Sequence, residues 1–262
     1  MSKLKATKGL IALLSLCLLI ASLRPAFAEN SPLSFLFCYE NKEFYPHFTG
    51  NSTTVPSKNA GALIDILIEL NHKVSEIDIN FIRKPWARCL SMLKSAEVTG
   101  IIGSYSKERA TYGRYPMKDK QLDNSRAFEV MSTCLIKHDS ALLSWDGKKL
   151  FFESPPVIAI PYGYHITSHL QQLGFIVYKT DSLKTAYTLL KAKRVSASIV
   201  DCKTKTIPAN SQFNSNPIRE HDGYFIINNN FYRANPNISE KLWNTLSQIN
   251  KKGHYSNYKL TQ

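Results

Sequence analysis

The segment from Ile79 to Pro116 most constrains the fold, because a strand, a helix and a second strand follow one another within it. Residues 79–83 form a short extended run. Pro85 opens the helix, since proline is tolerated in the first helical turn. Residues 98–103 are apolar except for Thr99 and predict a second, buried strand. Alternating β and α units of this kind are typical of a mostly parallel sheet.

Two hydroxyl groups and an arginine follow the second strand. Ser104, Ser106 and Arg109 come directly after its apolar residues. In an open α/β sheet, ligands bind beyond the carboxyl ends of the strands. A guanidinium binds a carboxylate through two parallel, charge-assisted hydrogen bonds, a geometry that lysine cannot copy. We therefore predict a carboxylate site here, with a surface ion pair to Glu108 or Asp119 as the alternative for Arg109.

The first 28 residues predict a cleaved export signal. A basic start precedes the apolar run Leu10–Ala21, and Ala26–Ala28 is an A-x-A cleavage site. A membrane anchor is the first alternative, but the run is shorter than the roughly 20 residues of a span. Lipid attachment at Cys17 is the second, but Leu16 stands where a small residue is needed. We predict export to a periplasm, with the mature chain starting near Glu29.

The length and charge of the chain limit its class. The 262 residues exceed a usual single domain of about 100–150, so two lobes are predicted for the exported part. The net charge of +13 makes nucleic acid a partner to consider. The basic residues are scattered, however, and the protein is predicted to be exported. We therefore expect a solvated basic surface and no nucleic-acid partner.

Four cysteines remain after the signal, and an even number in an exported protein indicates disulfides, with three possible connectivities. Cys38 and Cys89 both fall in the first lobe, whereas Cys134 and Cys202 fall in the middle region. We predict the pairs 38–89 and 134–202. Metal binding is the alternative, but neither a C-x-x-C motif nor histidine spacing supports it, so no metal or cofactor is expected.

Further elements extend the alternation of strands and helices. Arg126–Lys137 predicts a long strand that crosses between lobes, and Tyr224–Asn228 leads back to the first lobe. Residues 144–149 are a turn-rich insert. The other predicted strands are 34–39, 157–160, 175–178 and 195–200, and the other predicted helices are 60–73, 168–173, 183–191 and 239–251.

This order of elements resembles the type II periplasmic binding proteins, specifically the extracellular solute-binding protein family 3. The resemblance covers essentially the whole mature chain. It is carried by Trp86–Ile101, Ser106–Arg109, Ser182–Asp201 and the tail Asn235–Tyr255. It implies a two-lobed α/β fold of the Venus-flytrap type, with two hinge crossings, that closes over one small solute.

The resemblance also implies a division of the chain. Residues 29–125 and 226–262 would form lobe 1, and residues 126–225 would form lobe 2. An arginine on one lobe and an aspartate on the other would then face the same solute, so only the closed form would make both contacts.

Site residues follow from the same resemblance. Arg109 would bind the ligand carboxylate with Ser104 and Ser106, and Asp201 would bind its ammonium group. The remaining implied contacts are aromatic side chains and a backbone turn, namely Phe44, Tyr45, Trp86, Gly163 and Tyr164. Thr99 replaces the aspartate common in that family, and Arg88 adds a cation near the cleft. These departures allow a bulkier or more acidic solute.

Three functions are compatible with this sequence. The first is a monomeric periplasmic binding protein that captures an amino acid or related carboxylate for an ABC importer. The second is a dehydratase-like enzyme, which would need Glu43 or His165 as a general acid. The third is a sensor that presents its ligand to a membrane receptor. Glu40 and Glu43 are predicted to be solvated at the cleft mouth.

Overall fold

The computed structural model describes residues 31–204 and 207–259. The predicted signal, residues 1–28, lies outside the described residues. The described residues from Pro32 onward form one compact unit. Its main sheet has nine strands in the order β11-β10-β12-β7-β13-β3-β1-β2, with β4 paired to β13. The strands at its two ends are β1 (Leu33–Glu40), β2 (Ile77–Lys84) and β3 (Gly100–Ser104), and β10 (Val157–Pro161), β11 (Ile176–Thr180) and β12 (Ala197–Asp201).

Parallel pairing dominates at both ends of the sheet, as the alternation of elements predicts. Strand β1 pairs in parallel with β2 and β3, and β10 pairs in parallel with β11 and β12. Each group is covered by helices, listed in chain order as α2 (Ala62–Lys73), α3 (Trp86–Lys94), α4 (Thr167–Gln172), α5 (Leu183–Lys191), α6 (Asn229–Ala234), α7 (Pro236–Gln248) and α8 (Lys251–Lys259).

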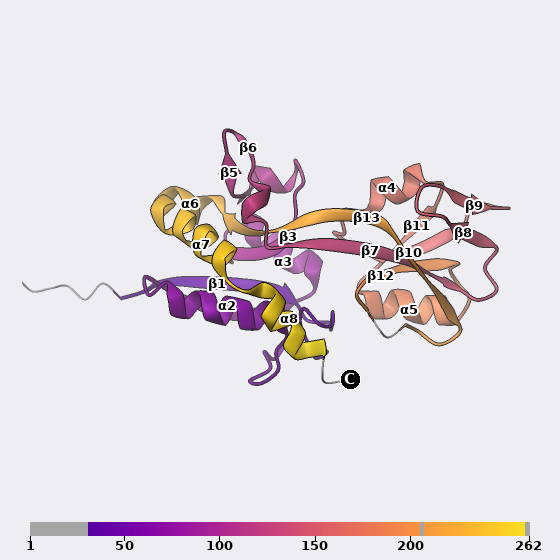
Figure 1. Ribbon diagram of the computed structural model, residues 1–262, viewed down its shortest axis with the longest axis horizontal. Helices are drawn as coiled ribbons and strands as arrows, with labels where there is room; N and C mark the ends of the chain where they lie inside the picture. Colours follow the sequence, from indigo (N-terminus) through magenta and orange to yellow (C-terminus); the bar gives the residue numbers. More distant parts are fainter. Residues whose placement is uncertain (1–30, 205–206, 260–262) are drawn as a thin grey trace, which may run out of the picture. The chain divides into compact units, whose positions relative to one another are not determined.

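Two long antiparallel strands join the groups. Strand β7 (Glu129–His138) pairs with β12 on one side and with β13 (Ser211–Asn228) on the other. Strand β13 also pairs with β3. Figure 1 shows both strands running between the two groups. They are the two hinge crossings of the fold. The lobe boundaries near residues 126 and 226 stay a prediction.

Strand β13 is longer than the sequence predicts, since only Tyr224–Asn228 was expected there. Residues 211–223 are largely polar and carry no alternation of apolar side chains. Their pairing with β7 is interrupted by a register shift between Asn214 and Arg219, around Pro217. Proline cannot donate to a ladder, so it is tolerated at such an irregularity. The tertiary partner, not the side-chain pattern, makes this segment a strand.

Each group of strands has its own apolar core. Phe35, Phe37 and Phe225 stack in the first, where Trp243 is fully buried and donates a hydrogen bond to the Phe225 carbonyl at 2.7 Å. A separate cluster around Ile158 and other residues of β10 and β12 fills the second. Each group also has a second buried cluster, around Leu93 in the first and around Leu190 in the second, so the described residues form four apolar clusters.

Two smaller predictions need correction. The single C-terminal helix predicted over 239–251 is two helices, α7 and α8, because Ile249 adopts an extended backbone with ψ 137°. The turn-rich insert predicted over 144–149 is a turn only from 146 to 149, because Ser144 and Trp145 belong to the first strand of a small hairpin. The short strands of the structure are β4 (Gly113–Arg114), β5 (Met117–Lys118), β6 (Gln121–Leu122), β8 (Leu143–Trp145) and β9 (Leu150–Phe152).

Two disulfides stabilise the fold. Cys38 at the end of β1 is bonded to Cys89 in α3, and Cys134 in β7 is bonded to Cys202, which follows β12. The predicted pairing is confirmed. Each bond ties an element of the sheet to a segment more than fifty residues away, since the sequence separations are 51 and 68.

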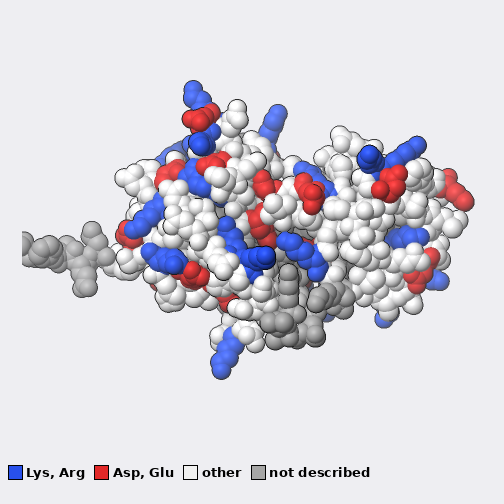
Figure 2. All heavy atoms as spheres, in the orientation of Figure 1, with Lys and Arg blue, Asp and Glu red and all other residues white. Residues whose placement is uncertain are grey.

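The surface carries charges of both signs. On the face drawn in Figure 2, lysine and arginine side chains are interspersed with aspartate and glutamate. Within residues 31–204 and 207–259, no helix has both the length and the apolar character that a membrane span requires.

Candidate ligand-binding site

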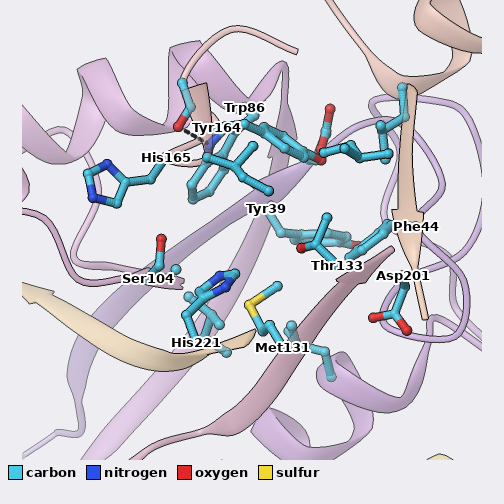
Figure 3. A pocket seen from close by; sticks show the side chains of 18 of the residues that line it. Tyr39, Phe44, Trp86, Ser104, Met131, Thr133, Tyr164, His165, Asp201 and His221 are labelled. Atoms are coloured by element: carbon cyan, nitrogen blue, oxygen red, sulfur yellow. Dashed lines mark hydrogen bonds between the residues drawn. The ribbon is translucent and has the colours of Figure 1, made fainter. Parts of the chain in front are cut away.

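A cavity of about 140 Å³ opens between the two groups of strands (Figure 3). A cavity of roughly this size accommodates a six-carbon ring in another protein, so a compact solute would fit. The carboxyl ends of β1, β3 and β12, the start of α3 and the turn after β10 all contribute to its walls. This is the edge of the sheet at which α/β proteins bind ligands.

The crossing strands form one wall of the cavity. Met131 and Thr133 of β7 pair in register with His221 and Arg219 of β13, and all four line the cavity. Alternate residues of a strand share a face, so the four side chains lie on the same side of the sheet. Sequence analysis missed Arg219 and His221 because it did not predict this part of β13.

Arg109 is the central cation of the site. It is only 5% exposed, and its Nη1 and Nη2 donate hydrogen bonds to the carbonyls of Ser104 (2.6 Å) and Gly163 (3.2 Å). The Ser106 hydroxyl accepts a hydrogen bond from the Arg109 backbone N–H at 3.0 Å. Ser106 therefore positions Arg109 from behind and does not line the cavity. Ser104 does line it, between His165 and His221 (Figure 3).

No acidic side chain of the described residues lies within 4 Å of the Arg109 guanidinium. The surface ion pair with Glu108 or Asp119 is therefore not formed. A buried charge without a counter-ion costs several kcal/mol, because carbonyl dipoles replace its hydration only in part. An anion bound in the cavity would supply the missing charge.

Trp86 and Gly163 form a contact between the two groups of elements. The Trp86 Nε1 donates to the Gly163 carbonyl at 3.4 Å, and the Arg109 guanidinium lies 5.8 Å from the Trp86 ring. Gly163 has φ +78°, and a side-chain Cβ there would come within 2.8 Å of Leu90. Only glycine fits. The Gly163 carbonyl accepts two hydrogen bonds, and the donation by the N–H groups of this turn that the resemblance implied stays a prediction.

Glu40 is buried in the same cavity. It is 6% exposed, and its Oε2 accepts a hydrogen bond from the Tyr164 hydroxyl at 3.4 Å. Burial raises the pKa of Glu40 to about 7, although Tyr164 and Arg83 oppose the shift. The expectation that Glu40 is solvated is therefore wrong. Glu43 is exposed and does not line the cavity, whereas His165 does.

Three of the four aromatic side chains predicted to contact the ligand line the cavity, and one does not. Phe44, Trp86 and Tyr164 line the cavity. Tyr45 lies outside it, because its hydroxyl donates to the Tyr258 carbonyl and its ring packs against Tyr258. Arg88 also lies outside, where it forms a half-exposed ion pair with Glu97 at 2.9 Å.

Asp201 lines the cavity but has partners within the protein. Its Oδ1 accepts from the Lys203 backbone N–H at 2.7 Å, and its Oδ2 lies 3.2 Å from His47 Nε2. His47 Nδ1 lies 3.1 Å from Glu129 and 2.8 Å from the Tyr255 hydroxyl. One imidazole therefore connects the loop after β1, the end of β12, the start of β7 and helix α8.

The His47 cluster was missed by sequence analysis, because no spacing relates its four members. His47 is 2% exposed. Burial alone would lower its pKa, but Glu129 and Asp201 outweigh that effect and raise the pKa to about 9. The same contact lowers the pKa of Asp201 against its desolvation. The imidazole is thus a charged bridge at neutral pH.

We expect the His47 bridge to make stability depend on alkaline pH. With a folded pKa of about 9 against 6.5 in the unfolded chain, its contribution is complete below pH 6.5 and is lost as the pH rises through 9. His47→Gln should therefore lower the free energy of unfolding by on the order of 2 kcal/mol at pH 6.5. Urea unfolding of both proteins at pH 6.5 and 9.5 measures this, and an equal difference at both values would contradict it.

Comparisons with known proteins identify the fold. No protein-family model and no curated protein sequence matches the chain. Solved structures do match over nearly its full length. The substrate-binding protein of an amino acid ABC transporter is 12% identical, with 86% of this chain and 96% of that chain covered and a TM-score of 0.61.

Two further structures have the same fold. A histidine kinase sensor domain with similarity to periplasmic binding proteins is 12% identical, covers 88% of this chain and 96% of its own, and has a TM-score of 0.66. A Salmonella typhimurium periplasmic binding protein of high arginine specificity is 13% identical, with 86% and 99% covered and a TM-score of 0.63. The chain therefore has the two-lobed type II periplasmic binding protein fold.

Proposed function

We propose that this protein binds a small carboxylate-bearing solute, an amino acid or a related compound, and releases it unchanged. The observation that carries the proposal is Arg109, a buried guanidinium at a cavity wall with no acidic partner among the described residues. A ligand carboxylate would complete its two-pronged hydrogen bonding.

The cavity has charges of opposite sign on different walls. Arg109 and Arg219 supply cations, whereas Glu40 and Asp201 supply carboxyl groups. Asp201 keeps unused lone pairs despite its two partners, since each carboxylate oxygen accepts two hydrogen bonds. Glu40 has no salt-bridge partner among the described residues and would become ionised beside an ammonium group. An amino acid would satisfy both kinds of wall.

Contacts across the cavity support closure over the solute. Arg109 and Trp86 reach Gly163 from one group of elements, and Tyr164 reaches Glu40 from the other. A solute that contacts both groups would bind the closed arrangement better than an open one. It would therefore shift the population toward the closed form.

The first candidate role of the protein is import of the bound solute. The match to a substrate-binding protein of an amino acid ABC transporter supports delivery of the solute to a permease. The two disulfides fit the oxidising periplasm to which the signal would direct the chain. The match to a histidine kinase sensor domain favours a second candidate, presentation of the solute to a membrane receptor. Cells that lack the protein should lose uptake of the solute if it serves import. They should keep that uptake if it serves a receptor.

A thermal-shift screen of amino acids and small carboxylates tests the proposal. A ligand at 100 times its dissociation constant should add about 2.7 kcal/mol, which raises the melting temperature by roughly 5–11 °C for a chain of this length. Amino alcohols that lack the carboxylate are the matched controls and should give no shift. NMR after long incubation should recover the ligand unchanged, and a converted product would favour the dehydratase-like alternative. Equal shifts with acid and alcohol would refute the carboxylate assignment.

A further inference from the structure

Two guanidinium groups line the cavity, and a single carboxylate bound to Arg109 would contact only one of them. Arg109 and Arg219 both line it, as do His165 and His221. Neither guanidinium has an acidic side chain within 4 Å among the described residues. A single carboxylate on Arg109 would leave the partly exposed guanidinium of Arg219 without an anionic contact.

Strand geometry keeps the nearest acids of β13 away from Arg219. Arg219 and His221 face the cavity, and alternate residues of a strand point to opposite sides. Glu220 and Asp222 therefore lie on the other face, where Glu220 accepts a hydrogen bond from Ser132 and Asp222 accepts one from Tyr224. Basic and acidic side chains alternate along residues 219–222, and only the basic ones, Arg219 and His221, face the cavity.

The two guanidiniums are held by the same turn. Arg109 donates to the Gly163 carbonyl at 3.2 Å, and Arg219 donates to the His165 carbonyl at 2.9 Å, two residues further along. These carbonyls are neutral, so they orient the guanidiniums without cancelling their charge. The two cations thus converge on one end of the cavity from different elements.

His221 adds a buried polar atom to this end of the cavity. Its Nδ1 is buried and makes no hydrogen bond among the described residues. Figure 3 shows its ring directed into the cavity, near Ser104. Burial, followed by repulsion from Arg219 and His165, lowers the pKa of His221 to about 4. Burial and the two guanidiniums also lower the pKa of His165. Both imidazoles are therefore neutral at pH 7 and can hydrogen-bond an anion without further repulsion between cations.

We propose that the solute carries two negatively charged groups, one bound by Arg109 and the other by Arg219 with His221. This inference rests on the proposed function, because it assumes that a carboxylate occupies the Arg109 site. The aromatic rings of Tyr39, Phe44 and Trp86 bound the rest of the cavity, so the two charges are joined by a short carbon skeleton. The ligand class is a short dicarboxylate, with or without an amino group.

Calorimetric titration of acid and amide pairs tests the second charge. The probes are glutamate and glutamine, aspartate and asparagine, and succinate and succinamate. Each pair has the same shape and differs by one negative charge. For at least one pair, we expect the acid to bind at least 30-fold more tightly than its amide. If in every pair the amide binds as well as the acid, the two-charge assignment is wrong while the carboxylate site stands.

The Arg219→Gln variant tests whether Arg219 binds the second negatively charged group of the solute. It should weaken binding of the acid at least tenfold and change binding of the amide by less than threefold. Arg88→Gln is the matched control, because Arg88 is paired with Glu97 outside the cavity. An unchanged acid-to-amide ratio in Arg219→Gln overturns the assignment. If no carboxylate binds the wild-type protein, the proposed function fails together with this inference. Melting temperatures of both variants verify that they are folded.

Discussion

Arg109→Gln is expected to weaken binding of a carboxylate solute by 100- to 1000-fold without lowering the melting temperature of the ligand-free protein. Removing one partner of a buried, hydrogen-bonded charge pair typically costs about 2–5 kcal/mol of binding energy, and each 1.4 kcal/mol is about a factor of ten. In the free protein, Arg109 is a buried cation whose guanidinium donates hydrogen bonds to two neutral carbonyls. A neutral amide there removes an unfavourable desolvated charge, so stability should hold or rise.

Two further variants test whether the loss of affinity comes from the guanidinium of Arg109 itself. Arg109→Lys keeps the charge but not the planar fork, so its affinity should fall between those of the wild type and Arg109→Gln. Arg88→Gln removes an arginine of the same lobe that lies outside the cavity and should bind normally. Titration calorimetry gives the affinities, and thermal unfolding gives the stabilities. Full affinity in Arg109→Gln would remove Arg109 from the site.

The second large effect is expected from the disulfides. The Cys134–Cys202 bond closes a loop with a sequence separation of 68, and the Cys38–Cys89 bond one of 51. The chain-entropy relation gives about 4 kcal/mol for either bond. The paired substitution of Cys134 and Cys202 by alanine should therefore lower the melting temperature by roughly 8–16 °C.

The matched variant replaces Cys38 and Cys89 by alanine. It should show a similar loss, because loop closure depends only weakly on loop length. Neither bond supplies a polar group to the solute, so both variants should bind it well below their melting temperatures. A change of less than 2 °C in either variant would show that the bond does not constrain the unfolded chain.

The site was only partly predictable. Trp86, Ser104 and Arg109 follow local patterns: a proline-initiated helix, and polar residues after an apolar strand. Such patterns place side chains at the carboxyl edge of a parallel sheet. Ser106 was assigned to the ligand, whereas its hydroxyl accepts from the Arg109 backbone. Sequence cannot distinguish these roles, because the same hydroxyl serves either one at the same position.

Other residues of the site depend on contacts between distant segments. Glu40 appeared solvated, yet Tyr164, far along the chain, covers it and raises its pKa through burial. Arg219 and His221 face the cavity because β7 pairs with β13 in one register. His47 meets Asp201 and Glu129 only once both groups of strands are assembled. No periodicity along the chain encodes such meetings.

The sequence by itself determined the α/β alternation, and it indicated the cysteine pairing that the structure confirms and Arg109 as the candidate carboxylate ligand. Each depends on neighbours within a few turns or on the order of elements, which hydrophobic periodicity reveals. Only the tertiary structure decided which charges lack partners. Burial and pairing arise when strands from both ends of the chain meet across β7 and β13. The electrostatic character of the cavity is therefore a property of the assembled fold.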